Sequence, residues 1–344
     1  MRNMCGRFTR SERGSFLPVF AIGLVPLVLA VGMSVDYTMA VSDKASMQNA
    51  LDAAVLSLTT MDKTATDADR QANLQSAFIA NGGQGTATLK SAVFGADGSV
   101  SLSATASYSM PTNFMNLAMI KSVPIGVSTS AKKNPALVNA SFKIDKASGY
   151  WDKKITLYGT QFGQSTAVPL MQITYVYNGK GGTKGYGTTT VLTPDNKGNF
   201  TVVAQQQTCT STTKKADAPA GSFKDGNLYT SCNMNVASAT GASIDVSKMN
   251  ALYLQMDVTT GTKATMKSND PKTSNFMYLN GTQIASGKTV DIFTAVPCGQ
   301  PSTQAWEDGG NNPPSPDVTN ADFFYTVTGK CDFNKRPSET VLTQ

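Results

Sequence analysis

Residues 16–35 read FLPVFAIGLVPLVLAVGMSV and contain no charged side chain. A helix of about twenty apolar residues is long enough to cross the hydrocarbon core of a bilayer. Pro18 falls in the first turn of such a helix, and a kink at Pro26 is tolerated in membrane helices. The segment therefore predicts one transmembrane helix in contact with a lipid bilayer.

The charges on either side of this segment predict its orientation. Residues 1–15 form a basic segment with four arginines and one acidic residue, whereas Asp36 directly follows the apolar run. Positively charged flanks stay in the cytoplasm. We therefore expect a single-pass protein of the bacterial inner membrane with a cytoplasmic N-terminus and a periplasmic remainder, or alternatively one exported to the cell surface. A cleaved signal peptide is the competing interpretation, but the run is longer than a usual signal core, and no clear small-x-small site follows Val35.

The composition narrows the functional classes. The 344 residues carry a net charge of +6, and the only dense basic cluster precedes the apolar segment. A nucleic-acid-binding protein would gather its excess charge in a patch, so we expect no nucleic acid partner. The sequence has no histidine, which removes the commonest general base and transition-metal ligand. We therefore expect no enzyme and no small-molecule substrate, and an extracytoplasmic hydrolase is the least favoured alternative.

The next region, residues 36–133, predicts a long helix followed by a small sheet. Apolar residues from Met47 to Leu58 recur every three and four positions, which places them on one helical face that continues the membrane helix. A second helix is expected over about 67–80, and Asn81-Gly82-Gly83 ends it. Strands are expected at 86–94, 99–108 and 122–130, and a short helix is expected at 111–120. This order of elements is typical of a pilin-like α/β stalk.

The remaining residues, 134–344, predict an all-β, sandwich-like extracytoplasmic domain. Lys132-Lys133-Asn134-Pro135 is typical of a linker. Short apolar and Thr-rich segments then alternate with turns such as Asn178-Gly179 and Asn280-Gly281. Candidate strands cover residues 138–144, 154–158, 171–177, 200–205, 251–258, 276–279, 290–293 and 323–327. The predicted fold class is therefore α+β, with a transmembrane helix, a stalk and a β domain.

The cysteines agree with an extracytoplasmic location for this domain. Four of the five lie far beyond the apolar segment, at Cys209, Cys232, Cys298 and Cys331. Two disulfides with three possible connectivities are compatible with them, and the pairing of sequence neighbours, 209 with 232 and 298 with 331, is preferred. Four unpaired buried thiols are the alternative.

With these residues in place, the N-terminal part resembles the TadG-like proteins of the tight-adherence (Flp, type IVc) pilus system. The resemblance rests on Arg7-Phe8, Arg13-Gly14, Pro26-Leu27, Val35-Asp36-Tyr37 and the run Met47-Gln48-x-Ala50-x-Asp52-Ala53-Ala54-x-Leu56. Met110-Pro111-Thr112-x-Phe114-Met115 and the strand over 123–131 are also similar to that family. The resemblance covers roughly the first 133 residues.

The resemblance implies a membrane-anchored component of a Tad/Flp-type pilus assembly machine, or a minor pilus-associated structural protein, with other pilus-assembly proteins as partners. Two features depart from related patterns. Val19 stands where substrates of a prepilin peptidase carry glutamate. The sequence Asp145-Lys146-Ala147-Ser148-Gly149 lacks the metal motif of the von Willebrand A domain found in many relatives, and we do not predict that domain.

An acidic loop near the C-terminus predicts a calcium site. It resembles the end of some calcium-associated bacterial surface β domains, and the oxygen donors would come from Glu307, Asp308, Asp317, Asn320 and Asp322. Calcium takes six to eight such oxygens. The alternative is a solvated loop whose Asp, Asn and Gly serve turn geometry. A calcium-stabilised surface adhesin or binding module is accordingly the second functional hypothesis.

Overall fold

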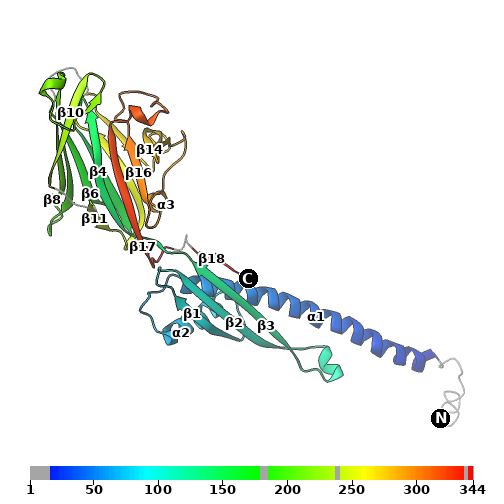
Figure 1. Ribbon diagram of the computed structural model, residues 1–344. Coiled ribbons are helices and arrows are strands. Elements are labelled where there is room, and N and C mark those ends of the chain that lie inside the picture. Colours follow the sequence, from blue (N-terminus) through cyan, green and yellow to red (C-terminus); the bar gives the residue numbers. More distant parts are fainter. Residues whose placement is uncertain (1–15, 179–184, 237–240, 337–339, 344) are drawn as a thin grey trace, which may run out of the picture. The chain divides into compact units, whose positions relative to one another are not determined.

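The computed structural model describes residues 16–178, 185–236, 241–336 and 340–343, and the chain divides into two compact units (Figure 1). We call Met1–Asn134 together with Pro337–Gln344 the helical unit, and Pro135–Arg336 the β unit. The basic segment 1–15 lies outside the described residues.

The helical unit is built on α1 (Phe16–Leu58), a continuous helix of 43 residues. The amphipathic pattern of its second half is confirmed, because Met47, Leu51 and Val55 are almost fully buried. In the first half, by contrast, Ile22, Leu27 and other described apolar side chains are exposed. The helix from Ile22 onward is long and apolar enough to cross a membrane. One helix therefore presents apolar side chains to the surroundings at one end and to the protein core at the other.

The buried face of α1 contacts a four-stranded antiparallel sheet and a second helix. Helix α2 (Asp67–Ala80) has its expected bounds, because Thr66 and Asp69 form a capping box at its start. The sheet has the order β1-β2-β3-β18, and β2 and β3 are joined by the short helix η3 (Met115–Ala118). Its strands are β1 (Thr86–Phe94), β2 (Val100–Pro111), β3 (Ser122–Lys133) and β18 (Thr340–Leu342).

Strand β18 belongs to the helical unit, whereas the predicted β-rich domain of 134–344 included its residues. Thr340 is the register partner of Lys133, so the chain returns to the edge of β3 after the β unit. The buried Lys133 side chain also donates a hydrogen bond from Nζ to the carbonyl oxygen of Thr59, at 2.9 Å. A cation at this helix end is favourable because the final carbonyl groups carry partial negative charge. The boundary missed β18 because three residues carry too little pattern to reveal a distant partner.

The β unit confirms the predicted all-β domain. Its strands form two layers around one core, with the orders β13-β12-β5-β6-β7-β8-β10-β9 and β11-β4-β17-β16-β14-β15, and the layers are joined where β4 meets β7. The strands are β4 (Ala136–Gly149), β5 (Lys153–Gln161), β6 (Ala167–Tyr177), β7 (Gly185–Pro194), β8 (Phe200–Thr212), β9 (Phe223–Asp225), β10 (Leu228–Val236), β11 (Ala242–Asp245), β12 (Met249–Val258), β13 (Ala264–Lys267), β14 (Met277–Leu279), β15 (Thr282–Gln283), β16 (Pro301–Trp306) and β17 (Phe323–Asp332).

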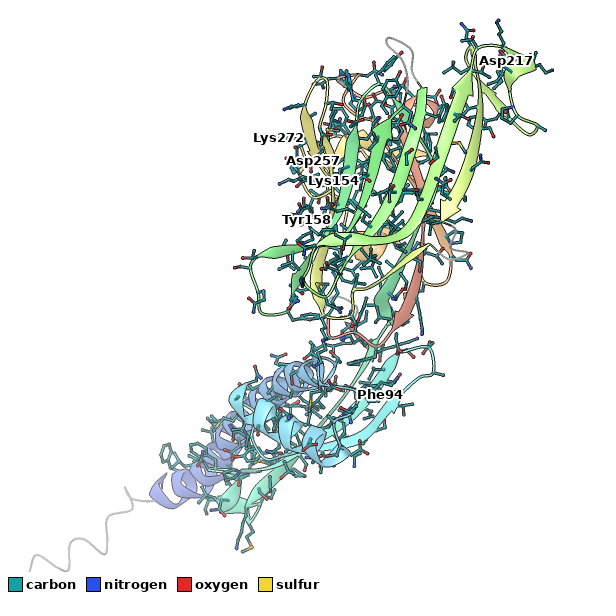
Figure 2. The ribbon with its side chains drawn as sticks, turned by 90° about the vertical axis from the view of Figure 1, so that its left-hand side faces the viewer. Phe94, Lys154, Tyr158, Asp217, Asp257 and Lys272 are labelled. Carbon is teal, nitrogen blue, oxygen red and sulfur yellow. A yellow bond between two sulfur atoms is a disulfide. The ribbon has the colours of Figure 1, made fainter. Side chains whose placement is uncertain are left out.

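Alternation along the strands separates the core from the outer surface. In β17, Phe323, Tyr325 and Val327 are buried in the shared core. On the outer surface of β5 and β12, Lys154 lies opposite Asp257, and the neighbouring Tyr158 stacks on Tyr253 with a ring separation of 5.0 Å (Figure 2). The sandwich therefore has one apolar interior and a mixed polar and aromatic exterior.

One predicted strand is wrong. Residues 290–293 form the entry to a short helix, α3 (Ile292–Ala295), because the Asp291 side chain accepts a hydrogen bond from the Phe293 amide and caps the turn. Ile292 and Phe293 are buried in either conformation, so apolar character alone does not distinguish the two. The remaining short helices of the β unit are η4 (Lys215–Asp217), η5 (Ser274–Phe276) and η6 (Val318–Asn320).

Candidate functional site

The acidic residues of the predicted calcium site come mainly from the end of β16 and the start of β17. Oxygens of Glu307, Asp308 and Asp322 lie within 4.8 Å of one another, and all three residues are buried. Asn320 joins them by donating from its amide nitrogen to Glu307 Oε2 at 3.2 Å. Four of the five predicted residues are thus brought together by the β16–β17 pairing.

A lysine lies within this group of carboxylates. The Lys153 ammonium is 2.5 Å from Asp308 Oδ2 and 3.6 Å from Asp322 Oδ2, and its side chain is fully buried. It also donates to the carbonyl oxygen of Ser148 at 3.0 Å and lies over the ring of Tyr175. Buried carboxylates need such a partner because removing a charge from water is costly unless it is paired. Lys153 therefore supplies the positive charge that the sequence hypothesis assigned to calcium.

The fifth predicted residue, Asp317, has a local role. Its side chain accepts a hydrogen bond from the Thr319 amide and caps η6. Hydrogen bonds from the Thr319 amide and hydroxyl hold the pKa of the Asp317 carboxyl below its usual range. The calcium ligand set stays a prediction, and an ion at the cluster would compete with the Lys153 ammonium for Asp308 and Asp322.

Two tyrosines near the cluster have raised pKa values. Burial, followed by the negative charge of Glu307, raises the pKa of Tyr278 to about 12. Its hydroxyl donates to the carbonyl oxygen of Ser315 in the acidic loop. Burial and then the charge of Asp322 also raise the pKa of Tyr175. Both phenols stay protonated at neutral pH. The ion pairs of Lys153 on β5 with Asp308 and Asp322 link the two layers of the sandwich.

Both preferred disulfides are confirmed. Cys209 and Cys232 are opposite residues of the neighbouring strands β8 and β10. Cys298 and Cys331 join the loop before β16 to β17. The second bridge lies near the C-terminal end of β17, whereas the acidic cluster lies at its N-terminal end, so the covalent and ionic restraints act at opposite ends of the same strand.

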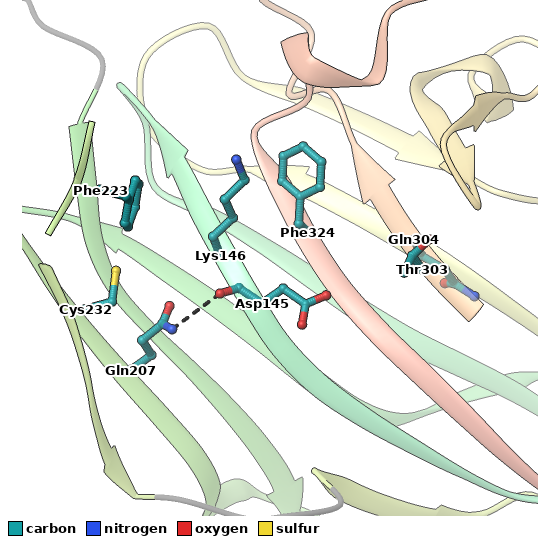
Figure 3. A pocket seen from close by; sticks show the side chains of 8 residues that line it. All are labelled: Asp145, Lys146, Gln207, Phe223, Cys232, Thr303, Gln304 and Phe324. Carbon is teal, nitrogen blue, oxygen red and sulfur yellow. Dashed lines mark hydrogen bonds between the residues drawn. The ribbon is translucent and has the colours of Figure 1, made fainter. Parts of the chain in front are cut away.

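A groove of about 460 Å³ lies between β8 and β4, and its lining includes Asp145, Lys146, Gln207 and Phe324 (Figure 3). Its charged groups already have partners. The Asp145 carboxylate accepts from the Thr326 hydroxyl at 2.7 Å, and Lys146 Nζ lies 4.7 Å from the centre of the Phe324 ring.

Two glutamines bridge the seam beneath this groove. The Gln207 amide donates to the carbonyl oxygen of Asp145, as Figure 3 shows, and the Gln205 side chain accepts from the Ile144 amide. Along this edge of β4, between the residues paired with β11 and those paired with β7, no described strand pairs with β4 through backbone hydrogen bonds. The two glutamine side chains therefore take the place of a strand partner for β4, and the groove lies above this gap in the backbone pairing.

A different arrangement occurs in the helical unit, where the apolar run ends. The Asp36 carboxylate accepts hydrogen bonds from the amides of Asn113, Phe114 and Met115, at 3.1, 2.9 and 2.7 Å. One turn earlier, Gly32 provides space for Phe114, because a Cβ atom there would lie 2.3 Å from the Phe114 Cβ. We call residues 112–121 the β2–β3 tip. This tip is fixed to α1 at the end of its apolar half.

Sequence reasoning missed the roles of Lys153, Asp36 and the two glutamines. A signal existed for Lys153, since it alternates with Ile155 and Leu157 and so belongs to the buried face of β5. The role of Asp36 had no local signal because its partners are 77 to 79 residues away in the sequence.

Comparison with known proteins agrees with the sequence resemblance. Residues 14–57 match the family model described as Putative Flp pilus-assembly TadE/G-like. The search of curated proteins and the search of solved structures gave no match. The matched segment coincides with α1, from the apolar run to the buried amphipathic half. The N-terminal part therefore carries a TadE/G-like domain, which supports a pilus-associated protein, and the resemblance beyond residue 57 stays a prediction.

Proposed function

We propose that this protein is a membrane-anchored component of Tad/Flp-type pilus assembly, or a minor structural protein associated with the pilus. The observation that carries the proposal is the coincidence of the matched segment 14–57 with one unbroken helix. The exposed apolar half of α1 is the anchor in the inner membrane, and its buried half is the core helix of the helical unit. The β unit is the part that contacts other pilus-assembly proteins.

Several features support a permanent anchor over a cleaved signal peptide. Helix α1 continues through Val35 without a break, and Asp36 is buried and hydrogen-bonded to the β2–β3 tip. A cut after Val35 would separate the anchor just before this contact. The arginines at Arg2, Arg7, Arg10 and Arg13 support a cytoplasmic N-terminus by the positive-inside rule. The two disulfides support a periplasmic β unit, because such bonds persist in oxidising compartments.

The proposed role is structural, with no catalytic step. The sequence lacks histidine, and the buried acidic cluster is neutralised in part by Lys153. The calcium-stabilised adhesin is the competing hypothesis. It requires a cation at a cluster that already contains an ammonium group, so we place it second.

Topology is the first test. The source cells are fractionated, spheroplasts are treated with protease, and the mature N-terminus is measured by mass spectrometry. We expect an intact or Met-trimmed N-terminus in the inner membrane, and digestion of the β unit only after the outer membrane is opened. A mature N-terminus beyond Val35 in a soluble fraction would overturn the anchor.

Pilus involvement needs a separate measurement. Deletion of the gene should reduce surface pili, and cross-linking in intact cells should capture pilus-assembly proteins on the full-length chain. A variant lacking 135–336 is the matched comparison, because it keeps the matched segment and removes the proposed contact surface. Wild-type piliation in the complete deletion strain would contradict the proposal.

A further inference from the structure

The β2–β3 tip exposes an unusual set of apolar side chains for a periplasmic loop. The exposed fractions are 69% for Leu117, 90% for Met119 and 41% for Ile120, and the Phe114 ring is exposed at 39%. Residues 112–121 contain no acidic residue, and Lys121 closes the segment. Exposed apolar clusters rimmed by polar residues mark protein or membrane contact sites.

The contacts with α1 fix the level of the tip along the helix. Asp36 holds the backbone of residues 113–115, and Phe114 packs at Gly32, one turn toward the apolar end. One helical turn is about 5.4 Å. Around this turn, Val31 and Val35 of α1 are also exposed. The apolar surface of the tip therefore continues the apolar surface of the anchor.

Most backbone amides of the tip have a hydrogen-bond partner, either within the tip or in the Asp36 carboxylate. The Leu117, Met119 and Ile120 amides donate to carbonyl oxygens within the tip, at 3.0, 3.0 and 3.1 Å. Thr112 and Lys121 close the loop at its base through a backbone hydrogen bond of 3.1 Å. Internal satisfaction matters because a backbone group without a partner is costly in a lipid environment.

From these observations we propose that the β2–β3 tip is a second membrane contact, which inserts Leu117, Met119 and Ile120 into the outer surface of the same bilayer that α1 crosses. The inference rests on the proposed anchor. Interfacial apolar groups enter the headgroup and acyl boundary to a depth of about 5–10 Å, and Phe114 already packs one turn of α1 beyond Asp36 toward the apolar end. Lys121 then extends its ammonium to the lipid headgroups. Asp36 is a positioning residue that fixes the tip against the anchor.

Tryptophan quenching in vesicles tests the insertion. Full-length Leu117→Trp and Met119→Trp variants are reconstituted in phosphatidylcholine and phosphatidylglycerol vesicles that contain lipids brominated near the headgroup or deep in the acyl chain. The matched control is Val93→Trp, an exposed apolar position at the opposite end of the same sheet. The signal of the two native tryptophans is subtracted with the wild-type protein.

We expect both tip variants to show blue-shifted emission and strong quenching by the shallow bromine, with weaker quenching by the deep bromine. The Val93→Trp control should show neither. If both tip variants are quenched no more than the control, the tip does not enter the bilayer, and the proposal is overturned. A Val28→Trp variant in α1 reports the anchor independently. Deep quenching at Val28 without quenching at the tip would overturn this inference alone, whereas no quenching at Val28 would overturn the anchor.

Discussion

The helical unit and the β unit are stabilised by different kinds of interaction. The helical unit uses one long helix as its core and has buried cations at its helix ends, Lys133 beside Thr59 and Arg70 beside the start of α2. The only cysteine of its sequence is Cys5, in the basic segment. The β unit has two disulfides and a buried ion-pair network between its layers. The core of the helical unit depends on a helix whose other half is exposed, whereas the β unit is cross-linked within itself.

This difference indicates which unit can stand alone. Half of α1 has exposed apolar side chains, so the helical unit needs lipid or detergent to stay dispersed. The β unit has a complete two-layer core within Pro135–Arg336. Perturbations of charge pairing or disulfides should therefore act on the β unit only, whereas changes at the start of α1 should act on the helical unit only.

The largest effect is expected for Lys153→Met. The change removes a buried cation that contacts two buried carboxylates, and such a loss costs about 3–5 kcal/mol of unfolding free energy. The matched control is Lys154→Met on the outer surface (Figure 2), where loss of the cross-strand pair with Asp257 costs about 0.2–1 kcal/mol. Urea unfolding followed by tryptophan fluorescence measures the stability of both variants, because Trp151 and Trp306 both lie in the β unit. Equal destabilisation would refute the role of Lys153 as counter-ion.

Adding calcium to the same urea unfolding experiment tests whether the cluster binds a cation. We expect millimolar calcium to leave the unfolding midpoint of the wild type unchanged, because the Lys153 ammonium competes for Asp308 and Asp322. The Lys153→Met variant should gain stability from calcium if the remaining oxygens can coordinate it. A calcium-dependent increase in the wild type would support the adhesin hypothesis.

A somewhat smaller effect is expected when Cys298 and Cys331 are both replaced by serine. Their loop of 33 residues predicts a loss of about 2–4 kcal/mol from the β unit. The helical unit should keep its thermal stability in detergent, as measured by limited proteolysis at increasing temperature. If digestion of 36–134 accelerates as much as digestion of the β unit, the two units are coupled and the comparison fails.

A change at Gly32 is expected to destabilise the helical unit and to leave the β unit unchanged. Gly32→Leu forces a side chain into the position of Phe114, and such overpacking costs about 1–3 kcal/mol. The matched control is Gly23→Leu, where nothing lies within 4 Å of the added Cβ. Tryptic cleavage at Lys121 in detergent should accelerate for the first variant and not for the second. Unfolding of the β unit should be unchanged in both.

The smallest effect on the helical unit is expected from the largest deletion. Lys133 and Thr340 are register partners in neighbouring antiparallel strands, so residues 134–339 replace what would otherwise be a hairpin turn. Replacing them with a short Asn-Gly turn should leave helix content and detergent stability of the helical unit unchanged, as measured by circular dichroism. Loss of the α1 packing in this variant would show that the β unit is required for the helical unit to fold.

The sequence predicted those parts of the fold that depend on local pattern. The apolar run, the buried face from Met47 to Leu58 and the capped helix α2 are encoded by residues close in the chain. The two disulfides followed from spacing and compartment.

Long-range partners account for what was missed. Strand β18, the glutamine bridges to β4 and the contact of Asp36 with the β2–β3 tip all join residues more than 60 positions apart. The calcium hypothesis named four residues that the fold brings together, and it omitted Lys153 because the lysine lies 155 positions before Asp308. Local alternation placed Lys153 on the buried face, but only the structure shows which charges it meets.

If α1 is the proposed anchor, its unbroken course couples the orientation of the helical unit to the tilt of the helix in the membrane. Its 43 residues extend over roughly 65 Å, of which the half after Asp36 accounts for about 33 Å. With the anchor in place, a tilt of about 20° in the membrane moves the Leu58 end sideways by roughly 11 Å, because no loop separates anchor from core. The β2–β3 tip, which contacts α1 at Gly32 and Asp36, would then place the pivot of this movement at the membrane surface. The proposed anchor would therefore convert the tilt of α1 directly into a displacement of the sheet that packs on it.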